Sequence, residues 1–355
     1  MIKENEILKA LSTVQEPDLH KDLVTLGMVK DISINENLIS FTVVLTTPAC
    51  PLKEKIRTDC INAVQAIYPS AAVSVNFTSN TTSNRSDGRL MLPGVKNIIA
   101  VVSGKGGVGK STIAANLAIA LAQGNASVGL MDADIYGPSV PMMFGVRGER
   151  PMMREVNGKN MIVPLEKYGI KLMSIGLLVD EKNAVVWRGP MASSAIRQFV
   201  TDVDWGELAY LVIDMPPGTG DIHLTLLQTV PVTGVIIVTT PQDVALADAK
   251  KGIAMFGQAQ INVPIIGLVE NMAWFTPAEL PQNRYYIFGK EGGKKLSEEY
   301  DLEFLGHIPL VQSIREGADA GLPAMAGSED TAKEGFYEFA SNAIRSISVK
   351  NAGQK

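Results

Sequence analysis

Cysteine is scarce in this sequence, with two residues among 355, which argues against a disulfide framework. Long apolar runs are also missing: no stretch reaches 18 apolar residues, and residues 1–6 lack the apolar region of a signal peptide. Charged residues make up only 19% and the formal net charge is −5, so no basic field points to nucleic acid. We therefore expect a soluble cytoplasmic protein without a membrane or nucleic-acid partner.

One short loop concentrates glycine and lysine, and it matches the phosphate-binding pattern G-x-x-x-x-G-K-[ST] at every fixed position. It follows an apolar, β-branched run over residues 97–103, which predicts a buried parallel strand, and precedes a helical pattern over residues 111–122. In this context Lys110 is predicted to reach the β- and γ-phosphates, and the Ser111 hydroxyl to ligate Mg²⁺. The residues predicted to bind nucleotide here are Gly104, Lys105, Gly106, Gly107, Val108, Gly109, Lys110, Ser111 and Thr112. The alternative is a glycine-rich turn that binds no ligand.

Acidic residues follow two of the predicted strands. Asp214 ends an apolar strand at residues 211–213, and an acid at the carboxyl end of a buried strand suits the Mg²⁺ shell of such a site. Residues 215–221 read Met-Pro-Pro-Gly-Thr-Gly-Asp and resemble a switch loop that senses the γ-phosphate. Asp132 and Asp134 end another strand, and Asp134 is predicted to orient the attacking water. The alternative for each acid is a helix cap or a loop position.

The chain divides by composition into two domains. Residues 78–87 are nearly all Ser, Thr and Asn, without an apolar residue, which is typical of a flexible linker. We predict a small α+β domain at 1–77, a linker at 78–92 and a P-loop domain at 93–350. The elements expected in the small domain are helices at 4–12 and 52–67 and strands at 38–45 and 72–77.

Strands and helices alternate after the linker. Strands are expected at 127–131, 211–214, 235–239 and 265–270, and helices at 243–258, 291–300 and 311–320. This alternation predicts βαβ units with right-handed crossovers. The fold class is therefore α/β, a P-loop NTPase with a mostly parallel sheet flanked by helices.

These motifs together carry a resemblance to a known family. The loop with its second lysine and the Asp-Ala-Asp stretch at 132–134 are similar to the deviant Walker A class of ATPases. More closely, the chain resembles the Mrp/ApbC-type iron–sulfur cluster carrier ATPases over nearly its whole length. The matching stretches are residues 134–139, 187–190, 214–221, 239–245 and 270–272. Residues 1–77 resemble the small domain of iron–sulfur assembly pathways.

The resemblance implies a Mg²⁺-dependent ATPase that works as a homodimer in the assembly or transfer of iron–sulfur clusters. Lys105 would reach the nucleotide of the partner subunit, so that Lys105, Lys110 and Asp134 form the catalytic set. Asn271 would contact adenine. ATP and Mg²⁺ are the expected cofactors, and apo iron–sulfur client or scaffold proteins are the expected partners. The alternative for Lys105 is a solvated loop lysine.

The sequence departs from this family in its cysteines. Typical members carry Cys-x-x-Cys soon after the Asn-Met pair, but residues 271–286 contain no cysteine. We expect Cys60 to be a core residue on one helical face. Cys50 is expected at a helix N-cap with Pro51 at the first helical position, where a thiol has a lowered pKa. A cluster held by cysteine alone takes four thiolates. A dimer of this chain has four thiols, so all of them would be needed, and cluster binding through Cys50 is left open.

Two other functions fit the same motifs. One is a positioning or partition ATPase, although the C-terminal residues 336–350 carry few cations for a membrane helix. The other is a nucleotide-switched adaptor or scaffold that holds no cluster itself. His20, His223 and His307 show no metal-ligand spacing and are expected to be structural or solvated.

Overall fold

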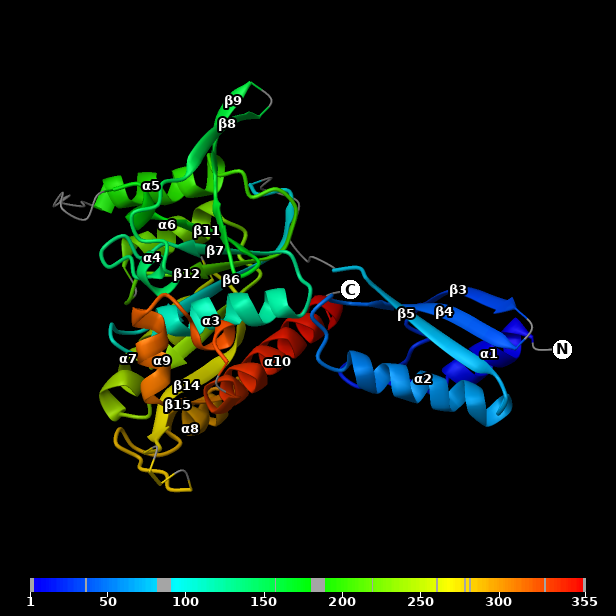
Figure 1. Ribbon diagram of the computed structural model, residues 1–355. Coiled ribbons are helices and arrows are strands. Elements are labelled where there is room, and N and C mark those ends of the chain that lie inside the picture. The colour runs from blue at the N-terminus through cyan, green and yellow to red at the C-terminus, as the bar shows by residue number, and fades with distance from the viewer. Residues whose placement is uncertain are drawn as a thin grey trace. The chain divides into compact units, whose positions relative to one another are not determined.

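The computed structural model describes residues 3–35, 37–81, 91–156, 158–179, 189–218, 220–259, 261–277, 279–280, 282–328 and 330–353. It divides into two compact units, one of Met1–Thr82 with Ile347–Lys355 and one of Ser83–Ser346 (Figure 1). The domain limits expected from the sequence stay a prediction. Most of the expected linker, residues 82–90, lies outside the described residues, and its first two residues belong to a strand that ends at Ser79.

The smaller unit is an α+β fold, as predicted. Its elements are α1 (Glu4–Leu11), β1 (Gln15–Glu16), β2 (Lys21–Asp22), β3 (Val29–Asn35), β4 (Leu38–Leu45), α2 (Lys53–Ile67) and β5 (Ala72–Ser79). The central strand β4 pairs antiparallel with β3 and parallel with β5. Alternate residues of β4, among them Ile39, Phe41 and Val43, are fully buried. They face Ile7 of α1 and Ile56 of α2 in one apolar core.

The larger unit is built on an eight-stranded sheet. Its strands are β6 (Val95–Ser103), β7 (Val128–Asp132), β10 (Leu165–Lys167), β11 (Ile170–Ser174), β12 (Leu208–Asp214), β13 (Gly234–Thr239), β14 (Ile265–Phe275) and β15 (Phe304–Leu310). They lie in the order β10-β11-β7-β12-β6-β13-β14-β15. Only β10 runs antiparallel to its neighbour, whereas the other seven strands are parallel. The predicted α/β architecture is confirmed.

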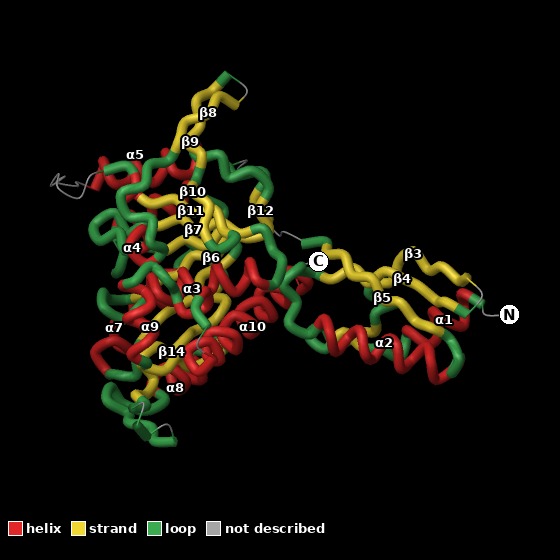
Figure 2. Tube along the Cα trace, in the orientation of Figure 1, coloured by secondary structure: helices red, strands yellow, loops and turns green. Residues whose placement is uncertain are grey.

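The remaining elements flank this sheet (Figure 2). They are α3 (Lys110–Gln123), α4 (Val140–Met143), α5 (Gly189–Thr201), α6 (Asp221–Thr229), α7 (Asp243–Phe256), α8 (Gly292–Glu299), α9 (Gln312–Asp319) and α10 (Asp330–Gly353), with short turns at Ile175–Leu177 and Ala324–Ala326. A separate hairpin is formed by β8 (Met152–Val156) and β9 (Lys159–Val163). No helix in the described part of the chain combines the length and apolarity that crossing a bilayer demands.

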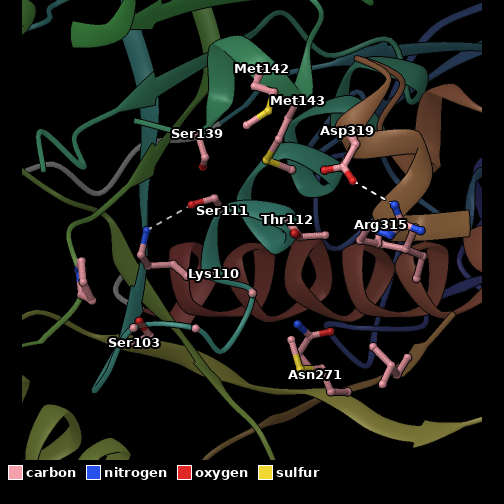
Figure 3. Close-up of a pocket in the computed structure, with 18 of the residues that line it drawn as sticks. Ser103, Lys110, Ser111, Thr112, Ser139, Met142, Met143, Asn271, Arg315 and Asp319 are labelled. Carbon is pink, nitrogen blue, oxygen red and sulfur yellow. Dashed lines mark hydrogen bonds and ion pairs between the residues drawn. The ribbon is translucent and has the colours of Figure 1, made fainter. Parts of the chain in front are cut away.

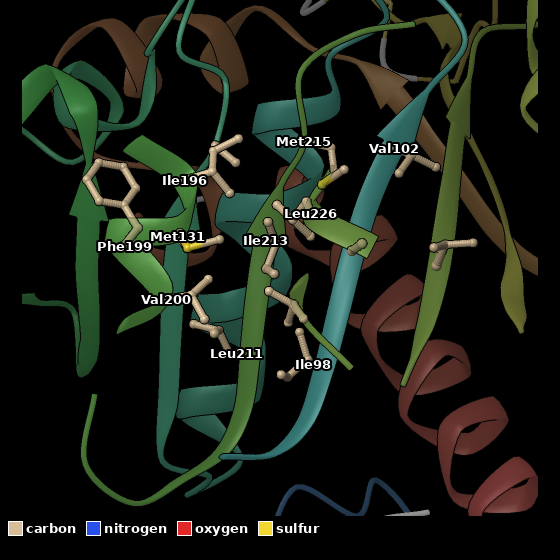
Figure 4. Packing of buried hydrophobic residues seen from close by; sticks show 14 of the residues in the cluster. Ile98, Val102, Met131, Ile196, Phe199, Val200, Leu211, Ile213, Met215 and Leu226 are labelled. Carbon is tan, nitrogen blue, oxygen red and sulfur yellow. The ribbon is translucent and has the colours of Figure 1, made fainter. Parts of the chain in front are cut away.

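A large apolar core joins one face of the sheet to α5, α6 and α7. Figure 4 shows Ile196 and Phe199 of α5 packed toward Met131, Leu211 and Ile213 of the strands. Each such side chain contributes roughly 1.5–3 kcal/mol when it is fully buried. Because side chains alternate along a strand, the other face is left for α3, which contacts β6, β7 and β12. This double-sided burial fixes the carboxyl ends of the central strands.

Candidate nucleotide site

The glycine-rich loop connects β6 to α3 at the centre of the sheet, as its sequence predicts. Gly107 and Gly109 have φ of 81° and 82°, a region that side chains disfavour. A Cβ on Gly109 would lie 2.1 Å from Asn271 Nδ2, and one on Gly104 would lie 2.3 Å from the backbone carbonyl carbon of Asp248. Glycine is therefore required at positions 104 and 109 by close contacts within the protein itself.

Lys110 is the hub of the charged groups at this edge of the sheet. Its Nζ lies 2.5 Å from Asp214 Oδ1, 3.7 Å from Asp134 Oδ2 and 3.4 Å from Ser111 Oγ. Strand register explains the gathering, since Asp214 pairs with Val101 on one neighbour and with Asp132 on the other. The structure thus brings together the predicted residues Lys110, Ser111, Asp134 and Asp214.

Asp132 has a structural role that the sequence did not reveal. It is fully buried and accepts hydrogen bonds from Ser174 Oγ at 2.9 Å, from the Asp134 backbone N–H at 3.1 Å and from the Val140 backbone N–H at 3.3 Å. Burial, with the nearby Asp214 carboxylate, raises the pKa of Asp132 to about 8. Burial also raises the pKa of Asp134, and the Lys110 ammonium opposes that rise. Asp132 therefore anchors the turn that holds Asp134.

The surroundings of Asp214 fit a divalent cation. Asp214 is fully buried, and its second oxygen, Oδ2, has no hydrogen-bond partner within the described residues. Such an oxygen ordinarily has a partner, and Mg²⁺ prefers carboxylate and hydroxyl oxygens. Asp214 and Ser111 are the residues that would hold the ion, as predicted from the sequence.

A cavity of about 460 Å³ opens beside the loop. Figure 3 shows that Ser111 and Thr112 face it from α3, Met142 and Met143 from α4, and Arg315 and Asp319 from α9. Arg315 Nη1 lies 3.1 Å from Asp319 Oδ2. The sequence gave no local signal for α9 in this wall, because the helix lies some 200 residues beyond the loop. The cavity has the size typical of small-molecule sites, on the order of 300–1,000 Å³.

Asn271 and Lys105 are placed in different ways. Asn271 lines the cavity, and its Nδ2 donates to the Val108 carbonyl at 2.8 Å, so it supports the loop; its predicted contact with adenine stays a prediction. Lys105 is partly exposed, and its carbonyl accepts a hydrogen bond from Ser103 Oγ at 2.9 Å. Its side chain is not part of the cavity wall, and its role across a dimer also stays a prediction.

Comparison with known families decides the class of this site. The family model described as NUBPL iron-transfer P-loop NTPase matches residues 94–345. The chain belongs to this family. A second model, described as an iron–sulfur cluster assembly protein, matches residues 4–77. The resemblance expected from the motifs is therefore confirmed in both halves of the sequence.

Named relatives and one solved structure agree with the family. The chain is 48% identical over 333 residues to an iron–sulfur cluster carrier protein of Synechocystis, covering 94% of each chain. It is 42% identical to the iron–sulfur cluster carrier protein of Escherichia coli K12, covering 94% of this chain and 91% of that one. A nucleotide-binding protein of Archaeoglobus fulgidus, solved in complex with ADP, is 36% identical with a TM-score of 0.59, over 71% of this chain and 98% of that chain.

The thiols of this family member differ from the prediction. Helix α2 begins at Lys53 with Leu52 as its cap, not at Pro51, so the expectation of an N-cap thiol at Cys50 was wrong. Cys50 packs against the core of the smaller unit, and burial raises its pKa to about 11. Cys60 is fully buried, as predicted, and its pKa is raised to about 12. Ligation by Cys50 stays a prediction, and its thiol loses the activation that was expected.

A buried histidine lies two residues beyond the switch-like stretch at 215–221. His223, on α6, is 1% exposed, and its Nε2 has no hydrogen-bond partner among the described residues. Burial, together with the charge of Lys110, lowers the pKa of His223 to about 4, so the ring is neutral. Within the motifs quoted from the sequence, Trp187, Arg188 and Thr219 lie outside the described residues.

Proposed function

We propose that this chain is a Mg²⁺-dependent ATPase of the cytoplasm that acts, as a homodimer, in the assembly of iron–sulfur clusters or their transfer to apoproteins. The observation that carries the proposal is Lys110, held between Asp214 and Asp134 beside the glycine-rich loop. Nucleotide phosphates would replace the two carboxylates as partners of the Lys110 ammonium. Asp134 would then orient the attacking water. The family and the names of its relatives support the link to iron–sulfur clusters.

Lys105 would complete the site from the opposite subunit. A cation placed on the transferring phosphate by a partner is worth roughly 10³–10⁵ in rate in GTPases. The test is ATP hydrolysis by the full chain. Lys105→Ala should bind ATP but hydrolyse it about 1,000-fold more slowly, whereas Lys96→Ala, which removes an exposed lysine of β6 outside the loop, should leave hydrolysis unchanged.

Mixing two inactive variants tests the dimer directly. Lys110→Ala should bind nucleotide poorly but still offer Lys105 to its partner, and Lys105→Ala should bind nucleotide normally. An equimolar mixture should therefore hydrolyse ATP although neither variant does so alone. A mixture that stays inactive, or full activity of Lys105→Ala alone, would remove the role of Lys105 across the dimer.

A second candidate is a nucleotide-switched adaptor that holds no cluster. It is favoured by the absence of cysteine from residues 271–287 and by the raised pKa of both thiols. Anaerobic loading with iron and sulfide, comparing wild type with Cys50→Ser, separates the two functions. Background iron in the wild type would support the adaptor, and a cluster that survives Cys50→Ser would exclude Cys50 as a ligand.

A further inference from the structure

The larger unit contains a second cavity, of about 500 Å³, that the nucleotide site does not use. It lies beside the ends of β14 and β15, next to the first turns of α10. Glu270 and Trp274 of β14, His307 of β15 and Glu338 of α10 contribute to its wall. No residue predicted from the sequence to act in function contributes to it.

The wall of this cavity carries an excess of negative charge. Its carboxylates come from Glu270, Glu291, Glu334 and Glu338, and its one guanidinium comes from Arg284. Arg284 lies over the Trp274 ring, 4.2 Å from its centroid. Among the described residues, Arg284 forms no ion pair with an acid. Within the same residues, Glu291, Glu334 and Glu338 form no ion pair with a basic group. The cavity is therefore suited to a cation.

Glu270 shows where such a cation would be held. Its side chain is 1% exposed. Its Oε2 accepts a hydrogen bond from the Gly293 backbone N–H at 2.5 Å, but its Oε1 has no hydrogen-bond partner within the described part of the chain. His307 Nε2 lies 3.6 Å from Oε1, which is too long for a hydrogen bond, and burial lowers the pKa of His307, which favours its neutral ring. A buried acceptor without a hydrogen bond is destabilising, and a donor from a ligand would remove that cost.

The chemistry of the wall favours an organic cation over a metal ion. Within the described residues, no group of three or more His, Cys, Asp or Glu side chains is arranged to hold a metal. The cavity instead joins carboxylates to the aromatic rings of Trp274 and Tyr286. Arg284 and Lys290 already lie over these rings, 4.2 and 5.1 Å from their centroids, so the wall accepts guanidinium and ammonium groups, and its carboxylates are left to bind a further one.

The surface around the cavity points to a polypeptide as the source of the cation. Four large apolar side chains of one neighbouring segment are exposed, namely Leu280, Tyr285, Tyr286 and Ile287. The segment is held in place by two backbone hydrogen bonds between Phe275 and Tyr285, of 2.8 and 2.9 Å. Exposed apolar groups beside a polar pocket are typical of protein-binding surfaces.

We propose that this cavity, which we call the acidic pocket, receives a lysine or arginine side chain from a partner polypeptide. The basic group would sit between Glu270 and Glu338, and the exposed side chains of Leu280, Tyr285, Tyr286 and Ile287 would contact the flanking chain. The proposal goes beyond the proposed function and does not depend on ATP hydrolysis.

Calorimetric titration of the full chain with short peptides tests the proposal. The probe is an acetylated, amidated Leu-Ala-Arg-Ala-Leu, and its control carries Gln in place of Arg. The arginine peptide should bind at least about tenfold more tightly than the glutamine peptide, which corresponds to about 1.4 kcal/mol. Glu270→Gln and the exposed Glu338→Gln should each weaken the arginine peptide about five- to tenfold. Glu298→Gln, which removes an exposed acid of α8 outside the pocket, should leave its affinity unchanged.

Three results would overturn the proposal. Equal binding of the arginine and glutamine peptides, or none at millimolar concentration, would remove the cation site. Equal weakening by Glu298→Gln and Glu338→Gln would reduce the effect to general charge attraction. Binding of free acetylarginine amide as tightly as the arginine peptide would replace the polypeptide by a small organic cation. Because Glu338 is exposed on its helix, its variant tests the pocket even where Glu270→Gln disturbs the packing of Gly293.

Discussion

The larger unit gathers the polar side chains that are predicted to act at its nucleotide site, whereas the smaller unit keeps its two thiols among apolar neighbours. Asp134, Asp214 and Ser111 each place a side-chain oxygen within 4 Å of the Lys110 ammonium. Cys50 and Cys60 instead pack in or against a core of aliphatic and aromatic side chains, and the pKa of each is raised. The predicted residues of the nucleotide site are thus already gathered around one ammonium, whereas the raised pKa of each thiol disfavours the thiolate that metal ligation requires.

Removing the Lys110 ammonium should break the first half of this comparison. Two hydrogen bonds to charged phosphates are worth about 2 kcal/mol each, so Lys110→Ala should weaken ATP binding on the order of 1,000-fold. The measurement is titration with a fluorescent ATP analogue. Lys110→Gln keeps a donor for the buried Asp214 without the charge, and so separates lost binding from lost stability. Tight ATP binding by a folded Lys110→Ala chain would contradict the assignment of the loop.

Thiol alkylation tests the second half. A pKa near 11 instead of the ordinary 9.0 leaves about 100-fold less thiolate at pH 8, because each pH unit changes the thiolate fraction tenfold. Iodoacetamide should therefore modify Cys50 about 100-fold more slowly in the folded chain than in denaturant, with a rate that rises up to about pH 11. Peptide mass spectrometry reports both thiols, and Cys60 serves as the slower internal reference. Equal rates at Cys50 in the folded and denatured chain would show an accessible thiol with an ordinary pKa, and a faster rate in the folded chain would show an activated one.

The smallest effect concerns the fit of the loop to β14. Gly109→Ala should lower stability by about 2 kcal/mol, since a side chain at its φ of 82° is strained and the added Cβ meets Asn271. Adding Asn271→Ala should recover about 1 kcal/mol of that loss. Gly106→Ala is the matched control, because its Cβ would meet only Pro217, at 3.9 Å. Thermal unfolding without nucleotide measures Gly109→Ala, Asn271→Ala, their double variant and Gly106→Ala, and strict additivity of the two single changes would exclude the clash.

Local sequence patterns predicted the features that depend on consecutive residues, such as a buried strand and the acid at its end. An apolar run and a following acid sufficed to place β12 with Asp214 at its end, because strand burial and strand direction are written in consecutive residues. The contact of Asn271 with Val108 and the position of α9 depend on pairings across more than 160 residues, which no local pattern encodes. Cys50 was misjudged because the chain makes one more turn, with Lys53 N–H bonded to the Cys50 carbonyl at 3.4 Å, before the helix begins.

Strand β14 carries two neighbouring residues that serve different cavities, Glu270 in the acidic pocket and Asn271 in the nucleotide pocket, and Pro309 and Val311 line both cavities. The backbone of β14 is therefore common to both cavities, and a ligand that shifted it in one cavity would also change the other. Binding free energies obey reciprocity: if nucleotide changes the affinity of a basic peptide by some factor, the peptide must change the affinity of nucleotide by the same factor. A basic peptide that tightens or loosens nucleotide binding would therefore reveal that the two cavities are coupled through β14.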